Sequence, residues 1–228
     1  MRRIRPRSSW IPLFALAAAS WISCRATILH AAETPARYTL LILGDSLAAG
    51  YGLDPSLAFP ALLQKRADEA GLPVTVINGG VSGDTTAGGL RRMDWLLRRP
   101  ADVLLLELGG NDGLRGLSPG ATRTNLTAII RKTREKNPAT AVVVAGMQMP
   151  PNMGEAYGKE FRDVFPQVAK EERATLIPFL LEGVGGVAEL NQPDQIHPTA
   201  AGHSLIASNL WVILEPVLRT LPPRTVQK

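Results

Sequence analysis

The chain has 228 residues, with 25 Lys and Arg against 20 Asp and Glu, which gives a formal net charge of +5 at pH 7. Residues 1–32 contain five arginines and no acidic residue, so they account for the whole excess of positive charge. The neutral remainder argues against a nucleic-acid-binding surface, and with Cys24 as the single cysteine it excludes an internal disulfide or a cysteine zinc cluster.

Residues 1–32 have the pattern of a secretory signal peptide. Four arginines precede an apolar stretch from Trp10 to Ile22 that is rich in Ala and Leu. We therefore expect cleavage of this segment and a periplasmic or secreted protein. A membrane anchor is one alternative, but the stretch is short for a span of about 20 residues and contains Pro12. Lipidation of Cys24 is another, although Trp21 stands where bacterial lipoproteins usually have Leu.

In residues 33–228, short apolar runs alternate with segments of helical periodicity. The runs are continuous, as expected for strands buried on both faces of a parallel sheet. They are Leu40 to Leu43, Val74 to Ile77, Val103 to Leu106, Val142 to Val144 and Leu176 to Phe179. Apolar residues share helix faces at Leu90, Met93 and Leu97, at Leu126, Ile129 and Ile130, and at Ile206, Leu210, Ile213 and Val217.

This alternation predicts one α/β domain with its core between about residues 35 and 221. We expect a three-layer α/β/α sandwich around a five-stranded parallel sheet of the flavodoxin-like type. The tail from Pro222 onward is expected to lie outside that core.

Glycine-rich and polar segments follow the first four apolar runs, at the carboxyl ends of the predicted strands. They are Gly44-Asp45-Ser46-Leu47, Asn78 to Thr85, Gly109-Gly110-Asn111-Asp112 and Gly146 to Pro151. Because active sites of open α/β sheets gather at these ends, the four segments are expected to meet at one crevice. Within them, Asp84 and Thr85 are typical of a helix start, while Asp45 and Asp112 are typical of loop-bracing acceptors.

One serine, one histidine and one aspartate predict nucleophilic catalysis. A serine hydroxyl is a weak nucleophile, so it needs a histidine to take its proton and a carboxylate to orient that histidine. Ser46 follows the first strand, and of the three histidines His30 falls in the predicted leader. Only His197 has an acid, Asp194, three residues before it in a loop-like setting. These three residues predict a serine hydrolase.

A metal site at the same place is the alternative reading of Asp194 and His197. Pro198 disfavours helical geometry at His197, and Thr199 is typical of the cap of a following helix, so the pair is expected on a loop. His203, in that helix, is expected to be a structural or surface residue. With so few cysteines and histidines, no metal ion is expected.

The four motifs, in this order, resemble the SGNH/GDSL hydrolase family, and within it the bacterial secreted arylesterases and the multifunctional thioesterase/lysophospholipase group. The resemblance covers nearly all of residues 33–228 and implies the SGNH hydrolase fold. It implies Ser46 as nucleophile and His197 as general base oriented by Asp194. It departs at Gln195, where the family often has Gly in Asp-Gly-x-His. The absence of Gly-x-Ser-x-Gly argues against the α/β-hydrolase fold.

The resemblance also implies an oxyanion hole built from Gly83 and Asn111. Physically, the side-chain amide of Asn111 and the backbone N–H of Gly83 are neutral donors suited to a carbonyl oxygen that gains negative charge. The backbone N–H of Ser46 would be a third donor.

The expected substrate pocket is apolar and flexible. Its candidate lining consists of Leu114, Leu117, Met147, Met149, Pro150, Tyr157 and Phe161. Methionine-rich surfaces adapt to varied shapes, which favours small acyl or aryl esters, with thioester and lysophospholipid cleavage as further activities. Sugar deacetylation, acyl transfer to an alcohol and a flavodoxin-like binding module without chemistry remain alternatives. We expect no cofactor, no nucleic-acid partner and no stable membrane span after removal of the leader, and the sequence gives no oligomeric state.

Overall fold

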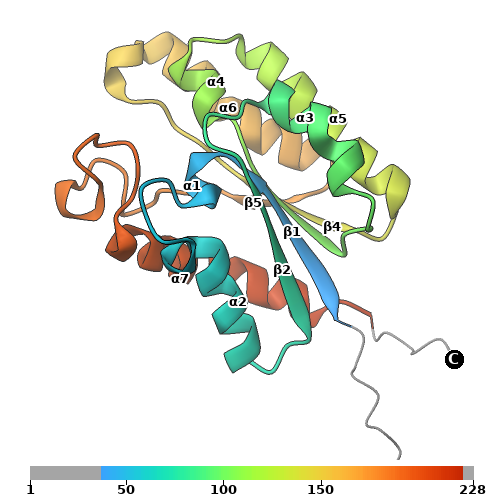
Figure 1. The fold of residues 1–228 in the computed structure, drawn as a ribbon. Coiled ribbons are helices and arrows are strands. Elements are labelled where there is room, and N and C mark those ends of the chain that lie inside the picture. The colour runs from blue at the N-terminus through green and yellow to red at the C-terminus, as the bar shows by residue number, and fades with distance from the viewer. Residues whose placement is uncertain (1–36, 223–228) are drawn as a thin grey trace, which may run out of the picture. The chain divides into compact units, whose positions relative to one another are not determined.

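The computed structural model describes residues 37–222. The predicted signal peptide, with Cys24 and His30, lies outside the described residues, as do residues 223–228 of the tail. Strands and helices alternate along the described chain and form a central sheet with helices on both sides (Figure 1). The predicted three-layer α/β/α sandwich is confirmed.

All five strands of the sheet are parallel and stand in the order β2-β1-β3-β4-β5. They are β1 Tyr38–Gly44, β2 Val74–Gly80, β3 Val103–Glu107, β4 Ala141–Ala145 and β5 Thr175–Ile177. The first four begin within two residues of the predicted runs. The last was predicted to reach Phe179, but Pro178 lacks the N–H that continued pairing needs, and β5 ends before it.

Strand β2 differs from the prediction because it is an edge strand. It pairs with β1 on one side, and within residues 37–222 no strand pairs with its other side. Only Val74 and Gly79 of β2 are buried, and Ile77 is 37% exposed, whereas β3 is buried throughout. The expectation that every run would be buried on both faces is therefore wrong for β2.

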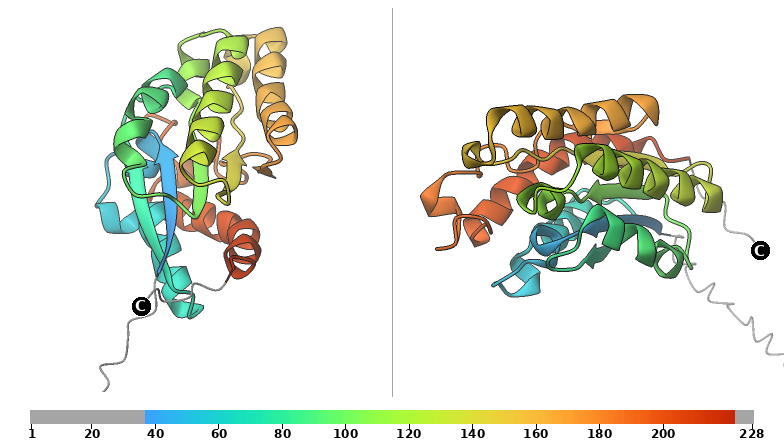
Figure 2. Two further views of the ribbon diagram at one scale, coloured as in Figure 1. Left: turned by 90° about the vertical axis from the view of Figure 1, so that its right-hand side faces the viewer. Right: turned by 90° about the horizontal axis from the view of Figure 1, so that it is seen from above.

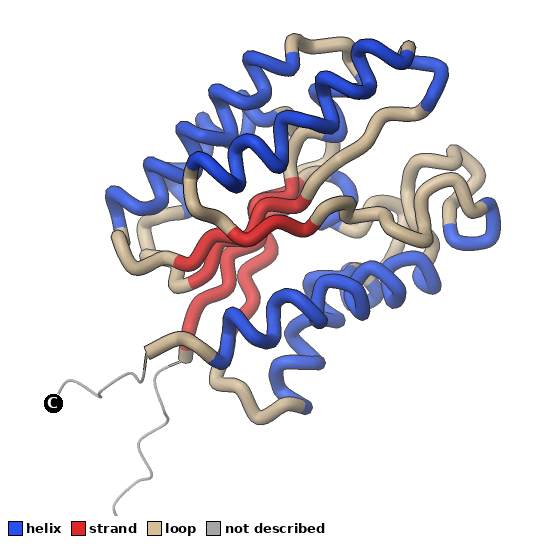
Figure 3. Tube along the Cα trace, turned by 180° about the vertical axis from the view of Figure 1, so that it is seen from behind, coloured by secondary structure: helices blue, strands red, loops and turns tan. Residues whose placement is uncertain are grey.

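Two groups of helices cover the two faces of the sheet (Figures 2 and 3). Helices α2 and α7 pack together on one face, while α3, α5 and α6 pack in series on the other. The helices are α1 Ser46–Ala49, α2 Phe59–Glu69, α3 Thr86–Leu96, α4 Gly110–Leu114, α5 Pro119–Lys136, α6 Glu155–Glu171 and α7 Ala200–Arg219.

The predicted core faces are confirmed on α5 and corrected on α7. Leu126, Ile129 and Ile130 of α5 are fully buried. On α7 the buried row continues from Ile206 and Leu210 through Leu214 and Leu218, while Ile213 and Val217 are only partly buried. A period of four residues keeps this stripe on one helix face, so the packed face is turned slightly from the predicted one.

The strand order places the site. In a doubly wound sheet of this order the winding reverses between β1 and β3, and ligands bind outside the carboxyl ends of the strands at that point. Ser46 begins α1 directly after β1, and Asn111 lies in α4 directly after β3. The two residues therefore meet at the switch point of the sheet.

Candidate active site

Ser46, His197 and Asp194 form a hydrogen-bonded series. Ser46 Oγ lies 2.9 Å from His197 Nε2, and His197 Nδ1 lies 2.7 Å from Asp194 Oδ2. With Asp194 ionised, Nδ1 carries the proton and donates to the carboxylate, which leaves Nε2 to accept from the serine hydroxyl. The three predicted residues are thus brought together in the arrangement that general-base activation of a serine requires.

The Asp194 carboxylate is held by its own loop. Oδ1 accepts hydrogen bonds from the backbone N–H groups of Ile196 and His197, at 2.9 and 3.0 Å. These bonds, led by the one from the His197 backbone, lower the pKa of Asp194 to about 2 although its side chain is 39% exposed. Gln195 has a φ of +59°, a conformation that favours glycine and that agrees with the family's frequent Gly at this place.

Two residues that the sequence analysis missed support the imidazole: Tyr51 from outside this loop and Gln192 from within it. The ring of Tyr51 packs on the ring of His197, with centroids 4.4 Å apart. The side-chain amide of Gln192 donates to the carbonyl oxygens of Tyr51 and Pro198, at 2.7 and 3.0 Å. Gln192 and Tyr51 are 141 positions apart in the sequence, so no local sequence pattern predicts their contact.

Asp45 braces the nucleophile turn, as predicted. It is the N-cap of α1, and Oδ1 accepts from the backbone N–H of Leu47 at 3.0 Å. Its other oxygen, Oδ2, accepts from Asn111 Nδ2 at 3.1 Å. Burial raises the pKa of Asp45 to about 6, and these hydrogen bonds oppose that shift.

Asn111 is carried by a short helix rather than by the predicted loop. Its neighbour Asp112 accepts from the backbone N–H of Thr86 at 2.8 Å and from the hydroxyl of the same residue. The hydroxyl of Thr122 completes this buried cluster at 3.4 Å. Asp112 therefore ties the start of α3 to α4, which confirms its expected bracing role.

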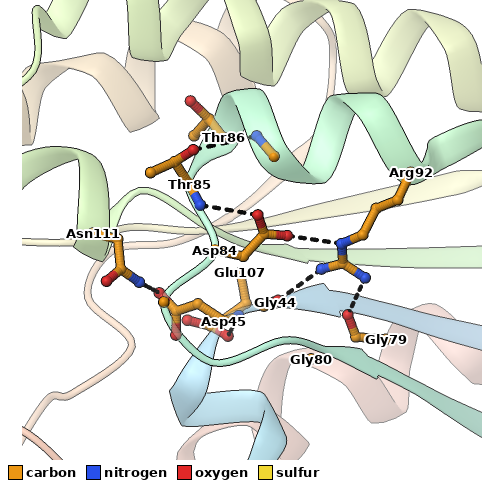
Figure 4. Close-up of polar contacts among 12 residues, drawn as sticks. Gly44, Asp45, Gly79, Gly80, Asp84, Thr85, Thr86, Arg92, Glu107 and Asn111 are labelled. Atoms are coloured by element: carbon orange, nitrogen blue, oxygen red, sulfur yellow. Dashed lines mark hydrogen bonds and ion pairs between the residues drawn. The ribbon is translucent and has the colours of Figure 1, made fainter.

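The segment that carries Gly83 is held by two arginines. Gly83 has a φ of +77°, and its carbonyl accepts from Arg115 at 2.8 Å, at the end of the helix that bears Asn111. Arg92 of α3 pairs with Asp84 at 2.7 Å and donates to the carbonyl oxygens of Gly44 and Gly79 (Figure 4). Asp84 stands directly before the cap of α3, as expected of a residue at a helix start, and it is also this ion-pair partner. The cap of α3 is Thr85, which accepts from Gly88 N–H.

A cavity of about 490 Å³ opens beside Ser46, Asn111 and His197. Four of the seven predicted pocket residues line it: Leu114, Met147, Met149 and Pro150. Three do not. Phe161 is fully buried beneath Gly109 and packs edge-on against Phe165. The hydroxyl of Tyr157 donates to the carbonyl oxygens of Gly113 and Leu117, so Tyr157 braces the end of α4, and exposed Leu117 lies outside the lining.

The opposite wall of the cavity was missed. It is formed by Phe179, Leu181, Gly185, Gly186 and Ile196, with Leu47 beside the nucleophile. All of these residues except Leu47 follow β5. The sequence analysis assigned site segments only to the ends of the first four strands, so it did not consider them. Gly83 and Asp194 do not line the cavity, and Asp194 lies behind the imidazole.

His203 is structural rather than catalytic. It is almost fully buried, and its Nδ1 accepts from the backbone N–H of Phe59 at 3.2 Å. Burial lowers the pKa of His203 to about 4. Among residues 37–222, no three His, Cys, Asp or Glu side chains gather as metal ligands. In the same part of the chain, no helix has the length and hydropathy to cross a membrane.

Comparisons with known proteins agree with this geometry. The model of the GDSL-like lipase/acylhydrolase family matches residues 42–205. Esterase TesA of Pseudomonas aeruginosa is 44% identical over 197 residues, covering 86% of this chain and 96% of the relative. The arylesterase of Vibrio mimicus is 40% identical, covering 77% and 88% of the two chains. Thioesterase 1/protease 1/lysophospholipase L1 of Escherichia coli is 38% identical, covering 79% and 85%.

A solved structure gives the same result for the fold. The crystal structure of TesA superposes with a TM-score of 0.76 at 44% identity, covering 78% of this chain and 99% of that one. With these relatives and its serine–histidine–aspartate geometry, the protein is a carboxylic ester hydrolase. The chain belongs to the GDSL-like lipase/acylhydrolase family.

Proposed function

We propose that Ser46 is the nucleophile of this esterase, that His197 is its general base and that Asp194 orients the base. The observation that carries this proposal is the pair of contacts at His197, 2.9 Å to Ser46 Oγ and 2.7 Å to Asp194 Oδ2. Ser46 lies at the edge of an apolar cavity, so a substrate carbonyl placed there meets the hydroxyl directly.

In the first half of the reaction, Ser46 Oγ attacks the carbonyl carbon while its proton passes to His197 Nε2. The tetrahedral intermediate collapses when His197 returns that proton to the leaving oxygen, which leaves an acyl-Ser46 ester. In the second half, water attacks this ester and gives its proton to His197, which then restores the serine hydroxyl. Asp194 stays ionised throughout and stabilises the imidazolium, in keeping with its pKa of about 2.

The growing negative charge on the substrate oxygen needs donors that are in place before the reaction. We assign this role to the amide of Asn111 and to the backbone N–H groups of Gly83 and Ser46. Arg115 joins the Gly83 segment to the helix that carries Asn111 and so fixes the spacing of two of these donors.

The cavity supports small acyl or aryl esters as substrates, with thioesters and lysophospholipids as further ones. Its volume of about 490 Å³ suits a chain longer than acetyl, and its walls are mainly apolar. Met147, Met149, Phe179 and Leu181 are among its apolar lining residues, and methionine side chains adapt to different shapes. An esterase and a thioesterase/lysophospholipase among the relatives agree with this range.

The arginine-rich, apolar start of the chain supports export, so we place the reaction in the periplasm or outside the cell. The mass of the mature protein recovered from a native host would test this. Loss of about the first 32 residues is the expected result, and an intact N-terminus would contradict export by cleavage.

The test of function is hydrolysis of p-nitrophenyl esters over a series of acyl chain lengths, by residues 33–228 and by the Ser46→Ala variant. We expect kcat/KM to fall by about 10⁴-fold or more in the variant, because Ser46 carries the only hydroxyl or thiol among the described residues that line the cavity. Ser56→Ala is a matched control, since that exposed serine only bonds Asp54 in its own turn.

Equal turnover by wild type and Ser46→Ala would overturn the assignment of the nucleophile. Product analysis with added alcohol separates hydrolysis from acyl transfer, since a transferase yields the new ester in place of the free acid. Turnover limited to acetyl groups would contradict the cavity argument and favour deacetylation.

A further inference from the structure

A buried glutamate lies directly under the nucleophile turn. Glu107 is the last residue of β3 and is fully buried, and its Oε2 accepts from the backbone N–H of Asp45 at 3.2 Å. A β-carbon at Gly44 would collide with Oε2, so the glycine of the motif leaves space for this carboxyl. Glu107 therefore supports the turn that presents Ser46.

Among residues 37–222, no cation acts on Glu107. Arg92 uses its guanidinium on Asp84 and on the carbonyl oxygens of Gly44 and Gly79 (Figure 4). The neighbouring titratable groups are Asp45, which acts on Glu107, and His197, which acts on Asp45. Among the described residues, Glu107 Oε1 is a buried side-chain oxygen without a hydrogen-bond partner. A carboxylate in such a place would be an unpaired buried charge, which is strongly unfavourable.

The carboxyl of Glu107 lies against Asp45, whose backbone N–H it accepts at 3.2 Å. Two carboxyl groups buried side by side do not both ionise, because each negative charge disfavours the other. Burial raises the pKa of Glu107 well above its usual range, and the neighbouring charge of Asp45 raises it further. Asp45 in contrast receives hydrogen bonds from Leu47 and Asn111, which favour its ionised form. The shared proton therefore belongs to Glu107.

We infer that Glu107 is a positioning residue of the oxyanion hole: as a neutral carboxylic acid it holds the nucleophile turn and donates to Asp45, which in turn holds the Asn111 amide. The series runs from Glu107 through Asp45 to Asn111 Nδ2, 3.1 Å from Asp45 Oδ2. The amide of Asn111 has two N–H bonds in one plane. One of them is donated to Asp45, and the other remains available to a substrate oxygen in the cavity that Asn111 lines.

The proton on Glu107 also reduces the negative charge behind the oxyanion hole. An ionised pair would place two negative charges behind the site at which the oxyanion forms, and their repulsion would raise the barrier. One proton on the pair halves that charge while it keeps the acceptor that Asn111 requires. This inference rests on the proposed roles of Ser46 and Asn111.

Two substitutions distinguish this role from a packing role. Glu107→Gln is an uncharged copy of the carboxylic acid, since its amide donates to Asp45 and its oxygen accepts from the backbone. We expect its kcat to stay within about threefold of wild type. Glu107→Leu removes the donor and the acceptor, and we expect kcat to fall by about 10- to 100-fold with KM nearly unchanged, less than for loss of an oxyanion donor itself.

The matched control is Thr140→Val. Thr140 is buried, and its hydroxyl donates to the carbonyl oxygen of Ala101 at 2.8 Å, just before β4 begins at the opposite end of the sheet. It should lose stability without loss of kcat. A Glu107→Gln variant as inactive as Glu107→Leu, or a Glu107→Leu variant with wild-type kcat at temperatures where both are folded, would overturn the inference.

A spectroscopic measurement is independent of activity and of the other residue assignments. The infrared difference spectrum between wild type and Glu107→Gln near neutral pH should contain the carbonyl stretch of one protonated carboxylic acid. A difference spectrum with only carboxylate bands would show that Glu107 is ionised and would refute the inference. If Ser46→Ala retained full activity while the acid band was present, the proposed function would fail and the protonation of Glu107 would stand.

Discussion

The two sides of the active site are held in different ways. On the serine side, the turn after β1 is fixed by groups from several elements: buried Glu107 from β3, and partly buried Asn111 from α4 and Arg92 from α3. On the histidine side, Asp194 and His197 lie in one exposed loop whose polar contacts are mostly its own. The serine side thus depends on the folded core, and the histidine side depends on local turn geometry.

Two aspartates illustrate the difference. Asp194 is partly exposed and receives hydrogen bonds from its own loop, led by the backbone N–H of His197, which lower its pKa to about 2. Asp45 is buried beside another carboxyl, and burial raises its pKa to about 6. Asp194, which must stabilise the imidazolium of His197, is therefore the aspartate that stays negatively charged. The titrating carboxyl is the one that shares its surroundings with the oxyanion hole.

Among the substitutions that test this comparison of the two sides, Asp194→Asn has the largest expected effect. The amide would no longer demand a proton on His197 Nδ1, so the imidazole would present the wrong tautomer to Ser46. We expect kcat to fall by about 10²- to 10⁴-fold. The melting temperature should hardly change, because the side chain is 39% exposed and its loop is local. A large drop in melting temperature would contradict the claim that the histidine side is held locally.

Arg92→Gln should have the opposite result: a large loss of stability and a smaller loss of activity. It leaves Asp84 unpaired and frees the carbonyl oxygens of Gly44 and Gly79, at a cost of about 3 kcal/mol in the free energy of unfolding. Urea unfolding measures this cost, and exposed Arg91→Gln on the same helix is the control. We also expect kcat to fall by about tenfold because the turn before Ser46 loosens. Unfolding curves that coincide for Arg92→Gln and wild type would refute the bracing role.

Substitution of His203 should have the smallest effect, a change in how stability depends on pH. Its folded-state pKa of about 4 lies below the usual value of 6.5, so between these values the unfolded chain binds a proton that the folded chain does not. The stability contributed by neutral His203 is complete above pH 6.5 and is lost as the pH falls toward 4. His203→Gln, whose side-chain oxygen can accept from Phe59 N–H, should reduce the drop in melting temperature between pH 7 and pH 5. An unchanged drop would mean that His203 is not the responsible group.

Much of the fold could be predicted because each inner strand is a continuous apolar run. The runs at Val103 and Val142 begin within one residue of strands β3 and β4. The edge position of β2 could not be predicted, since strand order depends on contacts between distant segments. Likewise, the exact buried face of α7 follows from its packing against α2 and the sheet rather than from periodicity alone.

The candidate site also contains residues that could be predicted from the sequence and residues that could not. Ser46 and His197 were predicted because chemistry restricts which residue types can do their work, and the chain offers few histidines. Glu107 was hidden inside an apolar run, where a single acid gives no local sign that it supports Asp45. Phe161 was misplaced because an aromatic residue near a loop has the same pattern whether it lines a cavity or fills the core.

The most direct test of the central claim is covalent labelling with a fluorophosphonate followed by peptide mass analysis. The reagent phosphonylates a serine that is activated by a neighbouring base, so it reports the Ser46–His197 contact without choice of substrate. We predict one adduct on the peptide containing Ser46, absent in Ser46→Ala and strongly slowed in His197→Ala. An adduct on a different serine, or no adduct on protein that hydrolyses esters, would contradict the account.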